Sequence, residues 1–357
     1  MIDFLIVGGG IAGLSAGARL SEHGSVTVLE AEDVLGYHAS GRSAALFEES
    51  YGPSSVVALN KAGAQYLRSE NGGYLTPRGL MLVGANHQSE VFEADCADLN
   101  MQRLSVDQAL SRIPILNRDI VGFAAISEGA FDIDTDRLLQ DFARVIRRNG
   151  GAVLTKCEVT RIQKAAHWTV EAGQVFEARH LINAAGAWVD EIAALAGVPP
   201  IGITPRRRSM ARIPAPGGHD VSTWPMMLGT GETWYAKPDA GKLLVSPSEA
   251  DPVTPHDAFA DDMVLAEGLA RYEELMTEQV TRVESNWAGL RSFAPDGTLV
   301  LGPDPAEPSF VWSAGQGGYG FQTAPAASQL LADLVIGNQP QIDQRFISLL
   351  TPERLNR

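Results

Sequence analysis

The N-terminal segment joins an apolar strand, a glycine-rich turn and a helix in an order that strongly limits the fold. The apolar run at residues 4–7 is followed by Gly8, Gly10 and Gly13, which form the pattern G-x-G-x-x-G at the entry to a helix. In such a turn the first glycine permits the tight bend, the second lets the backbone approach a pyrophosphate, and the third lets the helix pack closely on the strand. Glu30 ends the next apolar run, where an acid can accept hydrogen bonds from ribose hydroxyls. The segment therefore predicts a β-α-β unit that binds a dinucleotide at the helix N-terminus.

Composition restricts the partners and the compartment. The chain has 357 residues, enough for two domains, and its formal net charge of −15 argues against nucleic acid and anionic membrane surfaces as partners. Cys96 and Cys157 lie far apart and neither belongs to a C-x-x-C pair, while the seven histidines show no metal-ligand spacing, so we expect no disulfide framework and no metal. Because no apolar run reaches membrane-spanning length, we expect a cytoplasmic protein without integral membrane association.

Strand–helix alternation marks three separated parts of the chain. Apolar residues recur at helical spacing from Ile11 to about Gly24 and over residues 55–70, 135–149, 262–276 and 321–336. Between these parts the sequence is more polar and richer in short strand-like runs. The pattern predicts an α/β protein in which a discontinuous nucleotide-binding domain receives a second domain in pieces.

The motifs together resemble those of one superfamily, the FAD-dependent D-amino-acid oxidases and glycine oxidases. The resemblance rests on VGGGIAGLSAG, GYHASGRSAAL, DIDTD, NAAGAW, PRRRS, YAKPDAG, NWAGLRSF and GQGGYGFQT, which follow one another over nearly the whole chain. Within the superfamily the chain is most similar to the FAD-dependent D-arginine dehydrogenases. The resemblance implies a two-domain α/β fold with a GR2-type, Rossmann-like FAD-binding domain and a mixed-sheet substrate domain inserted in pieces. The expected boundaries are residues 1–78, 136–205 and 292–357 for the FAD-binding domain, and 79–135 and 206–291 for the substrate domain.

The resemblance also implies the residues that bind FAD. NAD is the alternative dinucleotide, but it would not need glycine segments beyond the first turn. We expect non-covalent FAD, because neither cysteine and no histidine lies in the C-terminal region where covalent family members carry their link. The turn GQGGYG and the following helix N-terminus would stabilise the flavin N1/O2 edge. The implied cofactor-binding residues are Gly8, Gly10, Gly13, Glu30, Gly41, Arg42, Ser43, Ala44, Val159, Ala185, Gly186, Gly317, Gly318, Tyr319, Gly320 and Gln322.

Two arginines are the candidate carboxylate clamp. An enzyme that oxidises an amino acid must hold its carboxylate in a fixed orientation, and the guanidinium fork matches a carboxylate in two parallel hydrogen bonds. The resemblance gives this role to Arg208 and Arg291, completes the pocket with Tyr51 and Tyr235, and lets the backbone at Gly318 contact the substrate amine. From the residues alone the alternatives stay open. An arginine in an RRR run is usually solvated, and Arg291, in an apolar context, needs an anion that an acidic residue of the protein could also supply.

The side-chain pocket departs from the D-arginine dehydrogenases. Leu80 stands where those enzymes read the substrate guanidinium with a glutamate, and Leu46 replaces a histidine of their active-site loop. Both changes predict an apolar pocket that favours neutral or apolar D-amino acids over D-arginine. The alternative is that Glu48 or Glu49 turns inward and supplies the missing charge. Because loop acids of a strongly acidic protein usually face solvent, we expect the apolar pocket.

The predicted function is FAD-dependent oxidative deamination of D-amino acids. Hydride transfer from the α-carbon to flavin N5 would give an imino acid, which hydrolyses to the 2-oxo acid and ammonia. The alternatives are a glycine- or sarcosine-type secondary amine oxidase, a 2-hydroxy-acid dehydrogenase, and a flavin-bearing subunit without catalysis. The sequence points to a small-molecule substrate and leaves the electron acceptor, oxygen or a quinone, and the oligomeric state open.

Overall fold

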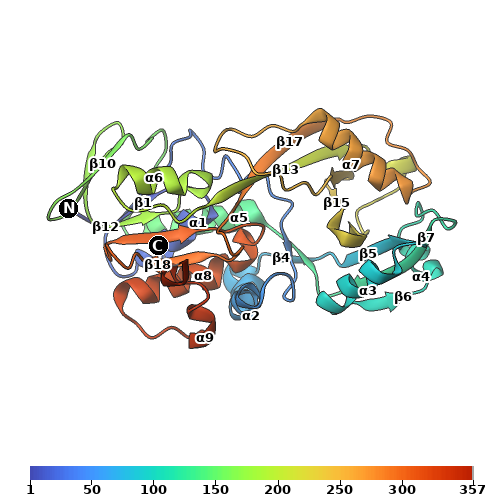
Figure 1. Cartoon of the computed structure of the whole chain (residues 1–357), viewed down its shortest axis with the longest axis horizontal. Coiled ribbons are helices and arrows are strands. Elements are labelled where there is room, and N and C mark those ends of the chain that lie inside the picture. Colours follow the sequence, from blue (N-terminus) through green and yellow to red (C-terminus); the bar gives the residue numbers. More distant parts are fainter. Residues whose placement is uncertain (356–357) are drawn as a thin grey trace.

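Two eight-stranded sheets carry most of the chain in this computed structural model, which describes residues 1–355. Figure 1 shows them toward opposite ends of an elongated molecule, with both termini at the same end. A three-stranded sheet, in the order β3-β8-β4, consists of β3 (Leu46–Phe47), β8 (Phe131–Ile133) and β4 (Leu75–Pro77).

The first sheet is built on five parallel strands. In spatial order these are β9 (Ala152–Leu154), β2 (Val26–Leu29), β1 (Ile2–Val7), β12 (Val175–Asn183) and β19 (Phe310–Ala314). Three antiparallel strands extend it, namely β10 (Arg161–Lys164), β11 (Trp168–Glu171) and β18 (Val300–Pro303). Parallel strands are buried on both faces, which explains why β1 and β2 read as continuous apolar runs. The order brings the carboxyl ends of β1, β2, β12 and β19 to one edge.

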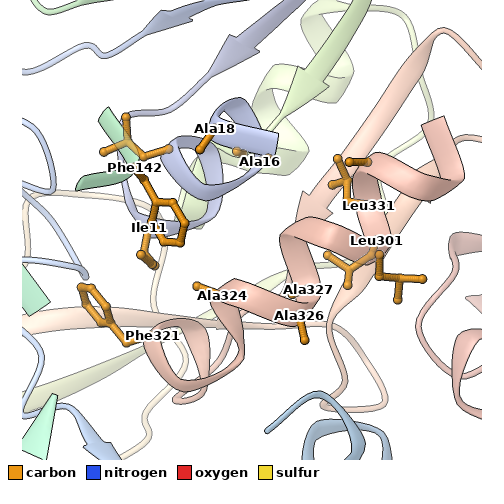
Figure 2. Close-up of a cluster of buried hydrophobic side chains, with 14 of the residues drawn as sticks. Ile11, Ala16, Ala18, Phe142, Leu301, Phe321, Ala324, Ala326, Ala327 and Leu331 are labelled. Atoms are coloured by element: carbon orange, nitrogen blue, oxygen red, sulfur yellow. The ribbon is translucent and has the colours of Figure 1, made fainter. Parts of the chain in front are cut away.

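Helices with small residues at their contacts cover this sheet. The helix α1 (Ile11–Leu20) packs against α5 (Thr135–Arg148) and α8 (Gly320–Ile336), and α2 (Ser54–Ser69) packs against α8. Figure 2 shows Ala16 and Ala18 of α1, and Ala324 and Ala327 of α8, in the shared core with Phe142 of α5. Alanines at these positions let the helix axes approach closely, so the two glycine turns that precede α1 and α8 lie near each other. The short helix α6 (Val189–Leu195) packs in a separate core cluster.

The second sheet is mixed. Its order is β17 (Ser285–Phe293), β13 (Thr204–Ile213), β16 (Lys242–Ser246), β15 (Tyr235–Asp239), β14 (Met226–Gly229), β5 (Leu80–Ala85), β7 (Val121–Ser127) and β6 (Gln102–Leu104). Only the β14–β5 pair is parallel among these neighbours in the described chain. The remaining helices are α3 (Ser89–Asp98), α4 (Val106–Arg112), α7 (Asp262–Glu274) and α9 (Gln344–Ile347).

The α/β fold class with its Rossmann-like unit is confirmed, and the five expected helices are present within a few residues of their predicted limits. The sequence did not predict the helices α3, α4, α6 and α9. In α3 only Phe92 and Cys96 are buried, so the sequence of this helix shows almost no apolar periodicity.

All strands of the mixed sheet lie within residues 80–127 and 204–293. The division into two domains stays a prediction. None of the helices formed by residues 1–355 combines the length and apolar content needed to cross a bilayer.

Candidate active site

A cavity of about 560 Å³ runs from the carboxyl ends of the parallel strands to the mixed sheet. Glu30 lies at one end, and Arg208 and Tyr235 lie at the other. Of the residues predicted for the site, the cavity is lined by Gly8, Gly10, Glu30, Arg42, Ser43, Ala44, Leu46, Val159, Ala185, Gly186, Arg208, Tyr235, Arg291, Gly317, Gly318, Gly320 and Gln322. Six predicted residues lie outside its lining, namely Gly13, Gly41, Glu48, Tyr51, Leu80 and Tyr319.

The first glycine turn uses its three glycines for different purposes. A Cβ on Gly13 would lie 1.9 Å from the carbonyl oxygen of Gly8, so the start of α1 packs directly on the strand end. Gly8 has φ +112°, and a Cβ there would meet the Ala184 carbonyl oxygen at 2.3 Å. Gly10 differs, because its nearest contact would be Ser40 Oγ at 3.2 Å. Gly13 and Gly8 therefore serve packing, while Gly10 leaves open space beside the cavity for a ligand.

Glu30 is buried, with 8% of its surface exposed, and fixes the turn from below. Its Oε2 accepts a hydrogen bond from the Gly9 N–H at 2.7 Å, and its Oε1 accepts one from the Glu32 N–H at 2.9 Å. A carboxylate has about four acceptor sites. Glu30 thus keeps acceptor capacity for hydroxyl groups in the cavity while it anchors the glycine backbone.

The N-terminus of α8 forms the second glycine cradle. Gly317 has φ +53°, a left-handed conformation that favours glycine, and α8 begins at Gly320 without a side-chain cap. The first N–H groups of α8 therefore receive no hydrogen bond from an N-cap side chain, whereas at the start of α1 the Ile11 N–H donates to Ser40 Oγ. A Cβ on Gly318 would lie 3.3 Å from Arg291 Nη1, so this turn also borders the arginine. Gln322 is buried and donates to the Tyr51 carbonyl oxygen at 3.4 Å.

The loop after β2 contributes mainly its backbone. The guanidinium of Arg42 is engaged by the protein itself, because Nη1 donates to the carbonyl oxygens of Ala258 at 2.9 Å and Ala288 at 3.0 Å, and Nη2 pairs with Asp257. The hydrogen bond from Arg42 holds the pKa of the Asp257 carboxyl below its usual range. Gly41 donates its N–H to the Gly36 carbonyl oxygen at 2.6 Å and shapes the turn. The charged groups of Arg42 are thus occupied in tethering the loop.

Arg208 and Arg291 lie on one face of two paired strands. Arg206 of β13 is opposite Arg291 of β17, and Arg208 is opposite Gly289, so the side chains of Arg208 and Arg291 are diagonal neighbours. Burial, and then the nearby charge of Arg291, lowers the pKa of the Arg208 guanidinium. Arg208 Nε is buried without a hydrogen-bond partner in the described chain.

No ion pair formed by residues 1–355 includes either of these guanidinium groups. The carboxylate of Glu249, which is close enough to influence Arg208, is bound elsewhere: its Oε1 accepts the Ser209 N–H at 2.6 Å and lies 3.9 Å from Arg207 Nε. Two cations at a cavity wall without a protein counter-charge form a site for an anion, because a desolvated charge needs a partner. The sequence left two possible partners for Arg291, a substrate carboxylate or an acidic residue of the protein. Within the described part of the chain no acidic residue forms an ion pair with it, which leaves the substrate carboxylate.

Three tyrosines lie near this anion site, and of these Tyr235 lines the cavity. The Tyr51 and Tyr319 rings lie 5.7 Å apart between centroids, and the Arg208 guanidinium lies 5.9 Å from the Tyr235 ring centroid. Burial, and then the carboxylate of Glu232, raises the pKa of the Tyr51 hydroxyl well above its usual range. Tyr51 therefore stays protonated at neutral pH and can act as a hydrogen-bond donor.

Glu48 is not solvent-facing, which corrects the expectation for this loop. Only 7% of its surface is exposed; Oε2 accepts a hydrogen bond from Ser127 Oγ at 2.6 Å, and Oε1 accepts the Ser50 N–H at 3.2 Å. Ser127 is paired in register with Leu80, so the Glu48 carboxylate lies beside the predicted side-chain pocket. Glu49 is only partly exposed, and its carboxylate pairs with Arg68. The expectation failed for Glu48 because the hydroxyl that stabilises its carboxylate comes from a distant strand.

Ser40 is one of the cavity-lining residues that were not assigned from the sequence. Ser40 Oγ accepts the N–H of Ile11, the first residue of α1, at 3.0 Å. His38 also lines the cavity; its Nε2 lies 2.8 Å from Glu32 Oε1, and its ring lies 4.6 Å from the Trp188 ring. A serine in a glycine-rich loop next to the first turn was the available signal for Ser40.

The two glycine cradles, the buried acid and the long cavity define a dinucleotide-binding protein of the α/β class. The chain matches the DAO family model, described as FAD dependent oxidoreductase, over residues 3–334, so the protein belongs to this family and its cofactor is FAD. A relative from Bos taurus, FAD-dependent oxidoreductase domain-containing protein 1, is 26% identical over 94% of this chain and 81% of its own length.

Solved structures of similar fold extend the comparison. Glycine oxidase from Geobacillus kaustophilus matches with a TM-score of 0.80 at 22% identity over 97% of each chain. L-proline dehydrogenase from P. horikoshii matches with a TM-score of 0.83 at 19% identity over 99% of this chain and 98% of that one. At these identities the likeness concerns the fold.

The cavity residues fit FAD. A dinucleotide needs backbone N–H donors without side chains in the way, and both helix N-termini at the cavity meet this need through Gly10 and Gly320. Glu30 supplies the acceptor at the far end, and the arginines lie at the opposite end, where they remain available to a substrate.

Proposed function

We propose that the protein is an FAD-dependent dehydrogenase or oxidase that deaminates D-amino acids. The observation that carries the proposal is the pair Arg208 and Arg291, which line the cavity with no ion pair to any carboxylate of residues 1–355. A substrate carboxylate is the anion that two convergent guanidinium groups bind best, through bidentate hydrogen bonds.

The chain's own residues orient the substrate. Arg208 and Arg291 hold the carboxylate, and the neutral Tyr51 hydroxyl donates a further hydrogen bond toward it. The backbone at Gly318, which lies next to Arg291, contacts the substrate amine. Tyr235 closes the side of the pocket beside Arg208. The bound flavin supplies the acceptor for the hydride, so the work of the protein is positioning.

Two in-family alternatives share the carboxylate site. Glycine oxidase and L-proline dehydrogenase, the structural neighbours, support a secondary or unsubstituted amine as the rival substrate class. A 2-hydroxy acid also presents a carboxylate to both arginines.

The preferred side chain depends on how Glu48 behaves. Leu46 and Leu80 support neutral or apolar D-amino acids, and both Glu48 oxygens already accept hydrogen bonds from Ser50 and Ser127. If Glu48 instead binds a cationic side chain, basic D-amino acids gain a charge-assisted hydrogen bond of about 1.5–3 kcal/mol. We propose the neutral preference as the first choice.

Anaerobic bleaching of the flavin absorbance tests the proposal. The panel is D-leucine, D-methionine, D-phenylalanine, D-arginine, D-lysine, glycine, sarcosine, L-proline and 2-hydroxy acids. Fastest bleaching by a neutral D-amino acid is expected, and bleaching only by 2-hydroxy acids, or by nothing in the panel, would contradict amino-acid oxidation. A tenfold or larger preference for D-arginine that disappears in Glu48→Gln, but not in the matched Glu49→Gln, would assign the charge to Glu48.

A further inference from the structure

A buried lysine lies behind the loop that lines the cavity. Lys237 follows Tyr235 by two residues in β15, so both side chains lie on the same face of the mixed sheet. Only 8% of Lys237 is exposed. A buried ammonium is unfavourable unless it is paired and hydrogen-bonded, so its partners indicate its role.

The partners of Lys237 are two backbone carbonyls and one carboxylate. Nζ donates to the carbonyl oxygen of Ala44 and, at 3.1 Å, to that of Ala45, and it lies 2.8 Å from Asp132 Oδ1. Arg78 holds the other oxygen of Asp132 through Nε at 2.7 Å. The ammonium is thus oriented by Asp132 and directed at consecutive peptides of the cavity loop.

The loop has a backbone conformation that needs such support. Ala45 has φ +32°, in the left-handed half of the conformational map that an alanine avoids. Ala44, Ala45 and Leu46 all line the cavity. Strained residues persist only where their surroundings fix them, and they concentrate at ligand sites.

We propose that Lys237 is a positioning residue for FAD binding. It holds the Ala44–Ala45 peptides in their strained conformation, so the loop has the shape that FAD requires before the cofactor binds. Because a trans peptide points its N–H opposite to its carbonyl, fixing both carbonyls on Lys237 turns the following N–H groups away from the ammonium. The loop then presents one fixed surface to the cofactor. This role depends on FAD binding alone and not on the identity of the substrate.

The test measures FAD affinity by titration of the apoprotein, together with the visible circular dichroism of bound flavin and the melting temperature. Lys237→Met should weaken FAD binding at least tenfold and alter the flavin dichroism. Lys237→Arg, which keeps a buried cationic donor, should recover part of both. Lys242→Met is the matched control, because this lysine of the neighbouring strand is partly exposed and pairs with Glu284; it should change neither.

A double-mutant cycle separates positioning from general stability. Ala45→Gly removes the penalty of the left-handed conformation, so the loss caused by Lys237→Met should fall from tenfold or more to less than threefold in that background. Equal losses in both backgrounds, or an FAD affinity of Lys237→Met within twofold of the native protein, would overturn the proposal. If Lys237→Met does not fold, Asp132→Asn with and without Ala45→Gly gives the same comparison, and the same absence of coupling would overturn it.

Discussion

The two ends of the cavity are built differently. At the nucleotide end the contacts come from short, contiguous segments, namely the glycine turn around Gly10 and the strand end at Glu30. At the substrate end they come from charged and aromatic side chains of β13, β15 and β17, namely Arg208, Tyr235 and Arg291. The first end depends on the absence of side chains, and the second on charges that tertiary structure brings together. The two ends should therefore respond differently to substitution.

The largest effect is expected at the substrate end. Arg291→Ala removes one of two guanidinium groups that have no counter-charge within the described chain, and breaking such a desolvated charge pair with the substrate costs about 3–5 kcal/mol. This predicts a loss of two to four decades in kcat/KM, measured by steady-state kinetics with the best substrate of the panel, about tenfold per 1.4 kcal/mol.

A matched substitution checks this assignment. Arg212→Ala changes an arginine of the same strand pair that is partly exposed and pairs with Asp239, so its kcat/KM should stay near that of the native protein. Both variants should keep their bound FAD. Near-native turnover by Arg291→Ala would remove it from the carboxylate clamp.

At the nucleotide end, substitution of two glycines of the first turn should have opposite effects on the stability of the apoprotein and on FAD binding. Gly13→Ala brings a Cβ to 1.9 Å from a backbone carbonyl, so it should destabilise the apoprotein by about 3 kcal/mol, the upper end of typical overpacking costs. Gly10→Ala meets only Ser40 Oγ at 3.2 Å, so the apoprotein should unfold at nearly the native temperature while FAD binding weakens.

Calorimetry of the apoprotein and FAD titration separate the two outcomes. Full FAD affinity in Gly10→Ala would mean that the pyrophosphate does not approach this position, and the difference between the two ends of the cavity would then be smaller than proposed.

The sequence predicted the nucleotide end of the cavity better than the substrate end. The β-α-β unit, the two glycine turns and Glu30 were readable because each is a local pattern with its own physical cause. Arg208 and Arg291 were found by resemblance, since an RRR run does not by itself indicate which arginine is buried. Their lack of an internal counter-charge was not readable at all.

The contacts that sequence reasoning missed join distant segments. Glu48 is held by Ser127, 79 residues away, and Lys237 contacts the Ala44 carbonyl from 193 residues away. A loop glutamate and a strand lysine carry no local sign of such partners, and average tendencies favour exposure for both. For this reason the prediction that Glu48 faces solvent was wrong, and the sequence did not indicate a role for Lys237.

A moderate effect is expected from Tyr51→Phe, which removes one hydroxyl from an otherwise intact clamp. Its kcat/KM should fall by an amount equivalent to about 1–3 kcal/mol, less than for Arg291→Ala. Because burial raises the pKa of Tyr51, its hydroxyl stays protonated through neutral pH, so the kcat/KM profile should show no basic limb from this residue below about pH 10. A Tyr51→Phe enzyme that loses a basic limb near pH 8 would contradict this role.

The smallest effect is expected at Tyr272, where burial raises the pKa of the hydroxyl as it does at Tyr51, but which lies in the core of the mixed sheet. Tyr272 of α7 packs against Trp234, and its hydroxyl is buried without a hydrogen-bond partner in the described chain. Tyr272→Phe removes this unsatisfied group, so it should raise the free energy of unfolding by about 1 kcal/mol and leave kcat/KM unchanged.

The pH dependence of stability tests the same substitution a second time. Burial raises the pKa of Tyr272 above the value of about 10 for an unfolded tyrosine, so its contribution to stability is present below pH 10 and is lost as the pH rises further, when the unfolded chain releases the proton first. Each such tyrosine steepens the alkaline loss by up to about 1.4 kcal/mol per pH unit. Urea unfolding between pH 9 and about 11 should therefore show a shallower decline for Tyr272→Phe than for the native protein. An unchanged slope would mean that the hydroxyl reaches water in solution, and Tyr272 would then no longer serve as the non-functional counterpart of Tyr51.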